Sequence, residues 1–153
     1  MAIDQREMHL RLIRLSEDRE IGFWAVDYDA LPEPRRVFRA IWELEAQVNN
    51  GGFHQYFWNA SAQTVSGILD ALQAIGATAT AAIVNDAIAA VGRNVSWQDD
   101  EARREKLAAL PDTIWQELEA LDQVFFRYPD DLTTLLYQYV CKHRNPIGAP
   151  ADF

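Results

Sequence analysis

Three histidines and one cysteine are the residues of this 153-residue chain most often used as metal ligands or nucleophiles. His9, His54 and His143 lie far apart, and none has a Cys, Asp or His partner at ligand spacing such as i+4 on a helix. Cys141 precedes His143 by two residues, which directs the two side chains to different sides of a helix. The sequence therefore predicts no metal site and no cofactor, and a small buried thiol at Cys141.

Covalent catalysis requires a nucleophile with a base beside it. The sequence contains no nucleophile elbow, phosphate-binding loop or dinucleotide-binding fingerprint. We therefore expect a protein that is not an enzyme and that acts by binding another macromolecule.

One segment, residues 49–59, concentrates amide and aromatic side chains. Its sequence is Asn49-Asn50-Gly51-Gly52-Phe53-His54-Gln55-Tyr56-Phe57-Trp58-Asn59. A functional interpretation is a ligand pocket around His54, Gln55, Tyr56 and Asn59. A structural interpretation has the asparagines satisfying backbone groups at a turn while the rings fill the core. The segment joins two apolar stretches, which favours the second interpretation and predicts a hinge with Phe53, Tyr56 and Phe57 buried.

The elements that position these residues are helical, because apolar residues recur at intervals of three and four almost throughout. Pro34 suits a first helical turn, and Gly51, Gly76 and Gly92 each follow an apolar stripe. The stripes are Val37, Ile41, Leu44 and Val48; Val65, Ile68, Leu69, Leu72 and Ile75; Ile83, Val84, Ala87, Ile88 and Val91; Leu110, Ile114, Leu118, Leu121 and Phe125; and Leu132, Leu135, Leu136, Tyr139 and Val140. The pattern predicts an all-α, single-domain bundle of seven or eight short helices over residues 1–153.

Two helix starts show recognisable capping residues. Thr78 or Thr80 is expected to cap the helix that ends at Gly92, and Ser96-Trp97-Gln98-Asp99 resembles a capping box.

The net charge of −9 limits the possible partners. A nucleic-acid-binding surface needs basic residues against the phosphates, so direct binding to DNA or RNA is not expected. No apolar run approaches the roughly 20 residues of a membrane span, and the N-terminal residues carry charges where a signal peptide is apolar. With a single cysteine, the sequence indicates a cytoplasmic protein that does not bind a membrane.

Residues 94–153 carry a net charge of −5 and hold the acids that could recognise a basic partner. Asp112, Glu117, Glu119 and Asp122 lie on or beside the outer side of the helix after Pro111, and the pair Asp130–Asp131 begins the next helix. Arg103, Arg104 and Lys106 interrupt this negative field. A solvated acidic face is the alternative, because carboxylates near helix N-termini interact favourably with the helix dipole whatever the function. A second acidic segment is Asp27, Asp29 and Glu33.

Residues 45–59, from Glu45 to Asn59, resemble the signature of a bacterial family of DNA-mimic-like proteins named after a Neisseria member. The similarity extends through Ala71–Ala77, Leu118–Phe126 and the pair Asp130–Asp131, and thus covers the chain from about Phe38 onward. One departure is Ala-Ser-Ala after Asn59, where a turn containing Gly is more usual. The resemblance implies an all-helical fold, a homodimer, and acidic side chains that imitate DNA before a transcriptional repressor.

The leading hypothesis is an acidic protein-binding domain that mimics DNA charge and occupies the DNA-binding surface of a transcription factor or other basic protein. The expected phosphate-mimicking acids are Asp112, Glu117, Glu119, Asp122, Asp130 and Asp131. The signature residues expected to be structural are Asn49, Asn50, Gly51, Gly52, Phe53, Gln55, Tyr56, Phe57 and Asn59. The alternatives are an interaction or immunity-type protein without DNA mimicry, and an enzyme or small-ligand binder around His54.

Overall fold

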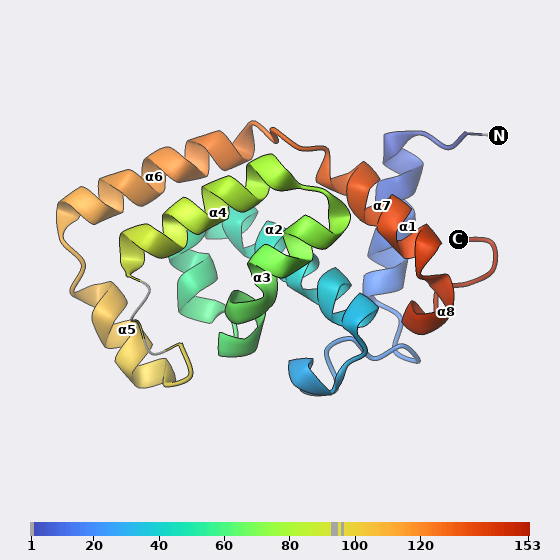
Figure 1. Ribbon diagram of the computed structural model, residues 1–153, viewed down its shortest axis with the longest axis horizontal. Helices are drawn as coiled ribbons and strands as arrows, with labels where there is room; N and C mark the ends of the chain where they lie inside the picture. The colour runs from blue at the N-terminus through green and yellow to red at the C-terminus, as the bar shows by residue number, and fades with distance from the viewer. Residues whose placement is uncertain (1, 93–94, 96) are drawn as a thin grey trace.

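The computed structural model describes residues 2–92, 95 and 97–153 (Figure 1). The described residues form eight α-helices, one 3-10 helix and no strand. In chain order these are α1 (Gln5–Ser16), η1 (Tyr28–Ala30), α2 (Glu33–Asn59), α3 (Ala62–Ile75), α4 (Thr78–Val91), α5 (Asp100–Ala108), α6 (Asp112–Phe126), α7 (Leu132–Lys142) and α8 (Arg144–Ile147). The predicted all-α, single-domain bundle is confirmed.

The long helix α2 is the centre of the bundle. It packs mainly against α3 and α6, and also touches α5, α7 and α8. Helix α6 lies beside α4 along one long edge of the molecule, whereas α1 lies beside α7 at the other end (Figure 1). Among the described residues, no helix combines the length and the apolar content that crossing a membrane requires.

Most predicted helix boundaries are confirmed, but the capping of α4 differs from the prediction. Helix α3 ends at Gly76, whose φ of 81° is left-handed. Neither Thr78 nor Thr80 caps α4 with its own side chain. Instead, Asp130 Oδ2 accepts from the backbone N–H of Thr80 at 2.7 Å and from its hydroxyl at 2.9 Å. In the proposed capping box, Ser96 lies outside the described residues, and Asp99 caps α5 through the N–H of Ala102.

The signature segment kinks α2 at its two glycines. Gly52 has a φ of 73° and a ψ of −174°, so the helix stops there and restarts at Phe53. Phe53, Tyr56 and Phe57 are fully buried, which confirms the burial expected at the hinge. The Phe53 ring packs edge-on against Phe125 of α6, with centroids 5.8 Å apart. The kink therefore directs three aromatic rings into the core, and one of them, Phe53, packs between α2 and α6.

Replacing Phe57 by Ala should destabilise the fold by about 3–5 kcal/mol, because a buried ring is lost and a cavity remains. Urea unfolding measures this loss. Val26→Ala is the control, since Val26 is 47% exposed and its loss should change the free energy of unfolding by under about 0.5 kcal/mol. Equal stability of the two variants would contradict a structural role for the Phe57 ring.

Candidate partner-binding surface

Three of the six acids expected on the outer surface are engaged in holding helix starts. Asp122 Oδ1 accepts from the backbone N–H of Phe53 at 2.8 Å, where α2 restarts after its kink. Asp130 holds the start of α4, as described above. Asp131 caps its own helix, accepting from the N–H of Thr134 at 3.1 Å and from its hydroxyl. These carboxylates satisfy N–H groups that lack partners within a helix, so their position is explained by the fold.

The other three acids, Asp112, Glu117 and Glu119, are exposed, and none forms a hydrogen bond or ion pair within the described structure. A fourth exposed acid, Asp86 of α4, faces the same surface: it lines an open hollow together with Glu117, Ala89, Ala90, Ile114 and Leu121. Asp86 was not among the predicted acids, because it lies on a helix whose sequence is dominated by its apolar stripe. The spacing of the buried residues on α4 was the available signal, since it places position 86 on the outer side with Ala82 and Ala89.

Helices α3, α4 and α6 contain no Lys or Arg. The bases expected to interrupt the negative field belong to α5, and Arg103 is not on the surface at all, being 2% exposed. Its guanidinium donates to the carbonyl of Trp97 at 2.8 Å and pairs with Asp100 at 3.0 Å. The prediction that Arg103 weakens the acidic surface is therefore wrong, because this side chain fastens α5 to the core.

The amides of the signature segment bond to one another. Gln47 Oε1 accepts from Gln55 Nε2 at 2.9 Å and from Asn59 Nδ2 at 3.1 Å, and Asn50 Nδ2 donates to Gln55 Oε1 at 3.2 Å. The expectation that Asn49 and Asn50 satisfy backbone groups at the turn is wrong, since Asp122 supplies the acceptor for Phe53. The network spans the kink and uses amides that a pocket would need for a ligand.

The glycines of the signature segment are required by close approach of other groups. A Cβ at Gly51 would collide with the side chain of Gln55, and one at Gly52 would collide with the carboxylate of Asp122. Gly52 also has the positive φ that L-residues avoid. Both glycines thus allow the acid of α6 and the amide network to approach the α2 backbone.

The alternative site around His54 is not assembled as expected. Tyr56 is fully buried, whereas His54, Gln55 and Asn59 line an open hollow with Gly51 and Trp58. The His54 ring lies 4.3 Å, between centroids, from Trp115, and partial burial lowers its pKa. The tyrosine hydroxyl that the proposed pocket needs points away from this hollow into the core.

Cys141 is exposed, which contradicts the prediction of a buried thiol. The buried side of α7 is formed by Leu132, Leu136, Tyr139 and Val140, and the next position along the helix turns outward. His143 lies against Tyr139, with ring centroids 4.3 Å apart, at the edge of that buried face as expected. Among the described residues, no group of three His, Cys, Asp or Glu side chains is arranged to hold a metal ion.

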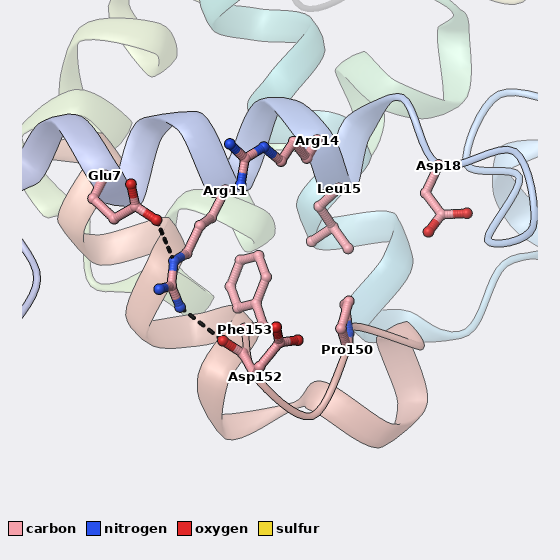
Figure 2. A pocket seen from close by; sticks show the side chains of 8 residues that line it. All are labelled: Glu7, Arg11, Arg14, Leu15, Asp18, Pro150, Asp152 and Phe153. Atoms are coloured by element: carbon pink, nitrogen blue, oxygen red, sulfur yellow. Dashed lines mark hydrogen bonds and ion pairs between the residues drawn. The ribbon is translucent and has the colours of Figure 1, made fainter.

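One hollow lies between α1 and the C-terminal segment (Figure 2). Its lining residues are Glu7, Arg11, Arg14, Leu15, Asp18, Pro150, Asp152 and Phe153. Arg11 Nε donates to Glu7 at 2.9 Å and one of its terminal nitrogens donates to the carbonyl of Asp152 at 2.8 Å. The guanidinium of Arg11 is thus engaged by the chain itself, and it fastens the C-terminal segment to α1.

Glu45, within the resemblance region, is a largely buried acid whose environment the sequence did not indicate. Its Oε2 accepts from the Tyr128 hydroxyl at 3.0 Å, and that hydroxyl accepts from Asn49 Nδ2 at 2.6 Å. Burial raises the pKa of Glu45 to about 7; the Tyr128 hydrogen bond opposes this rise, and the negative charge of Asp131 adds to it. A carboxyl that titrates near neutral pH makes both stability and binding at this position sensitive to pH.

Asp122→Ala should destabilise the fold by about 1–3 kcal/mol, because it leaves the buried N–H of Phe53 without an acceptor. Glu119→Ala, an exposed position on the same helix, should change the free energy of unfolding by under about 0.5 kcal/mol. Denaturant unfolding of both variants checks this, and a similar small change in each would show that the Asp122 hydrogen bond does not stabilise the kink.

Glu45 should make the wild-type protein less stable as pH rises from about 4.5 to 7. The folded pKa is raised above the ordinary value of 4.5, so the folded state binds more protons than the unfolded state in this window. The loss can reach about 3 kcal/mol, at about 1.36 kcal/mol per pKa unit. Urea unfolding from pH 4.5 to 8 should show this decline in the wild type, and Glu45→Gln should remove most of it. An unchanged pH profile in the variant would disprove the assignment.

Comparison with protein-family models gives a match to the family described as DMP19-like protein over residues 29–143. No curated protein and no solved structure was found to match the chain. The matched residues include the kinked segment of α2, the acids of α6 and the Asp130–Asp131 pair. Because the match covers well over half of the chain, this protein belongs to the DMP19-like protein family.

Proposed function

We propose that this protein binds the DNA-binding surface of a transcription factor or other basic protein, and that exposed acids of α4 and α6 stand in for DNA phosphates. Membership of the DMP19-like family supports a DNA-mimic role. The observation that carries the proposal is a surface formed by α4 and α6 with exposed carboxylates and no Lys or Arg on either helix. We call Asp86, Asp112, Glu117 and Glu119 the α4–α6 acids.

The spacing of the α4–α6 acids supports this role. Asp112, Glu117 and Glu119 lie within seven residues of one another, which is about 10 Å along a helix axis. A DNA strand carries one phosphate per about 3.4 Å of its axis, so the charge density along α6 is of the same order. Asp86 adds a charge across the hollow between the two helices. The negative surface therefore extends from α6 onto α4.

The acids proposed to bind the partner differ from the six acids expected from the sequence. Asp122, Asp130 and Asp131 are held by N–H donors, and changing them would disturb the fold as well as a partner surface. We therefore exclude them from the test. A homodimer, which the family resemblance implies, is part of the proposal, and the exposed apolar side chains Val124 and Phe126 at the end of α6 support an additional contact there.

The test is a triple variant, Asp112→Asn, Glu117→Gln and Glu119→Gln, against a DNA-binding protein isolated from the native host by binding to the wild type at low salt. The variant should stay folded, because exposed substitutions away from caps cost little. Its affinity for that partner should fall at least tenfold, and the salt dependence of binding should flatten because fewer charged contacts remain. A duplex carrying the partner's DNA site should compete with the wild type.

The matched control is Asp27→Asn, Asp29→Asn and Glu33→Gln, which removes the same three negative charges from the second acidic segment. It should leave the affinity unchanged within about twofold. A loss in the control alone would place the interface on that segment. Binding that is insensitive to both salt and DNA competition would favour an interaction protein without DNA mimicry.

A further inference from the structure

A groove separate from the α4–α6 acids runs between α1, α2 and the start of α7. Its narrow part has a volume of about 170 Å³, and it opens into a wider part of about 540 Å³. Four residues line both parts and make the groove continuous: His9, Glu45, Asn49 and Thr133. Trp42 and Leu12 form the apolar wall of the narrow part, and Asp131 lies in the wide part.

Glu45 is held in the groove with one oxygen free. Its Oε2 accepts from the Tyr128 hydroxyl, whereas its Oε1 has no donor within the described structure. Tyr128 has a φ of 49°, a left-handed conformation that costs free energy in a residue other than glycine. That conformation places its hydroxyl between Glu45 and Asn49. The carboxyl is therefore positioned rather than free to turn to solvent.

Among the described residues, Glu45 has no cationic partner at ion-pair distance. Arg6 and His9 line the groove from α1, yet neither forms an ion pair with Glu45 or Asp131 among the described residues. Asp131 adds a second negative charge; burial opposes its ionisation, but hydrogen bonds from Thr134 and Gln5 lower its pKa. A largely buried carboxyl beside a second carboxylate is costly unless a positive charge is brought to it.

We propose that this groove binds a guanidinium group, with Glu45 as its carboxylate partner, the nearby charge of Asp131 as an added attraction, and Trp42 as its aromatic wall. A guanidinium presents planar N–H donors that match carboxylates and stacks on aromatic rings, which a compact ammonium does less well. The Trp42 ring stacks near His9, with centroids 6.3 Å apart, and on Phe38, with centroids 5.6 Å apart, so it lines the groove with the part of the indole that these two rings leave uncovered. This inference does not rest on the proposed function, since none of these residues belongs to the α4–α6 acids.

The test follows the indole N–H resonance of Trp42 by NMR, assigned with Trp42→Phe. The wild-type protein is titrated at pH 8, where Glu45 is ionised, with N-acetyl-arginine amide and with N-acetyl-citrulline amide. Citrulline has nearly the shape of arginine without the charge. The arginine probe should shift the resonance saturably and the citrulline probe should not. Equal shifts from the two probes would overturn the proposal.

Three variants test which residues bind the arginine probe. Glu45→Gln should lower the affinity for the arginine probe by about tenfold or more, because it removes the negative charge of the largely buried carboxyl. Asp131→Asn should weaken binding of the probe as well, because it removes the second negative charge; asparagine keeps a capping oxygen, and urea unfolding of this variant checks that it is folded under the conditions of the titration. Glu105→Gln, which removes an exposed charge on α5, should bind normally. Unchanged affinity in both groove variants would refute the site.

n-Butylguanidine, a free guanidine without peptide groups and with the same single charge as the arginine amide, distinguishes the two sources of this chemistry. Binding equal to that of the arginine amide assigns the groove to a small guanidine, whereas weaker binding assigns it to an arginine side chain of a protein. The α4–α6 triple variant should bind the arginine amide as the wild type does. That result separates a failure of the groove from a failure of the proposed function.

Discussion

The hydrogen bond from the backbone N–H of Phe53 to Asp122 is the interaction on which much of this structure depends. A helix that stops and restarts within the core leaves N–H groups without acceptors, and burying them unsatisfied is costly. Gly52 adopts the left-handed φ that allows the restart and has no Cβ to block the carboxylate. Once the kink is fixed, Phe53 packs against Phe125 of α6 and Phe57 packs against Phe53, and α6 lies beside α4. The glycine pair and the acid therefore function together, although 69 residues separate Phe53 from Asp122.

The residues from Asp122 to Asp131 connect distant parts of the fold in the same way. Asp122 accepts a hydrogen bond from the backbone where α2 restarts, and Asp130 accepts one from the backbone at the start of α4. Asp131 caps α7 and also accepts from Gln5 of α1 at 2.9 Å. Tyr128 reaches Glu45 of α2 from the same stretch. Carboxylates at helix N-termini stabilise the helix through its free N–H groups and its dipole. Here two of the three caps act between helices rather than within one, so a short acidic segment sets the relative positions of α1, α2, α4 and α7.

Local patterns in the sequence predicted the helices, their glycine and proline boundaries, and the burial of the aromatic rings at the hinge. These features depend on spacing within one element, and spacing can be read along the chain. The sequence did not indicate which acids would be free. Asp122 and Asp130 have their partners in α2 and α4, and Arg103 is buried by contacts with carbonyls before its helix and at the end of α2. Cys141 was misplaced for a simpler reason, since it follows two buried residues on α7 but lies one step around the helix from them.

Some of the acids cap helices and others are free, and this difference limits the surfaces on which a basic partner can be recognised. A carboxylate that accepts from N–H donors of its own chain is fixed in direction and partly neutralised, so it offers less to an incoming cation than a free one. Removing the three caps from consideration leaves Asp112, Glu117 and Glu119 on α6, with Asp86 across the hollow. Those four lie on helices that carry no base to weaken their field. At the other end of the molecule, Glu45 is half-buried beside Asp131 in a groove and is sensitive to protons as well as to cations. An exposed row of carboxylates attracts many basic surfaces through long-range charge, whereas a carboxyl at the base of a groove discriminates by shape. The same net negative charge thus supports two different kinds of recognition, and the caps contributed by the segment from Asp122 to Asp131 hold both surfaces in place.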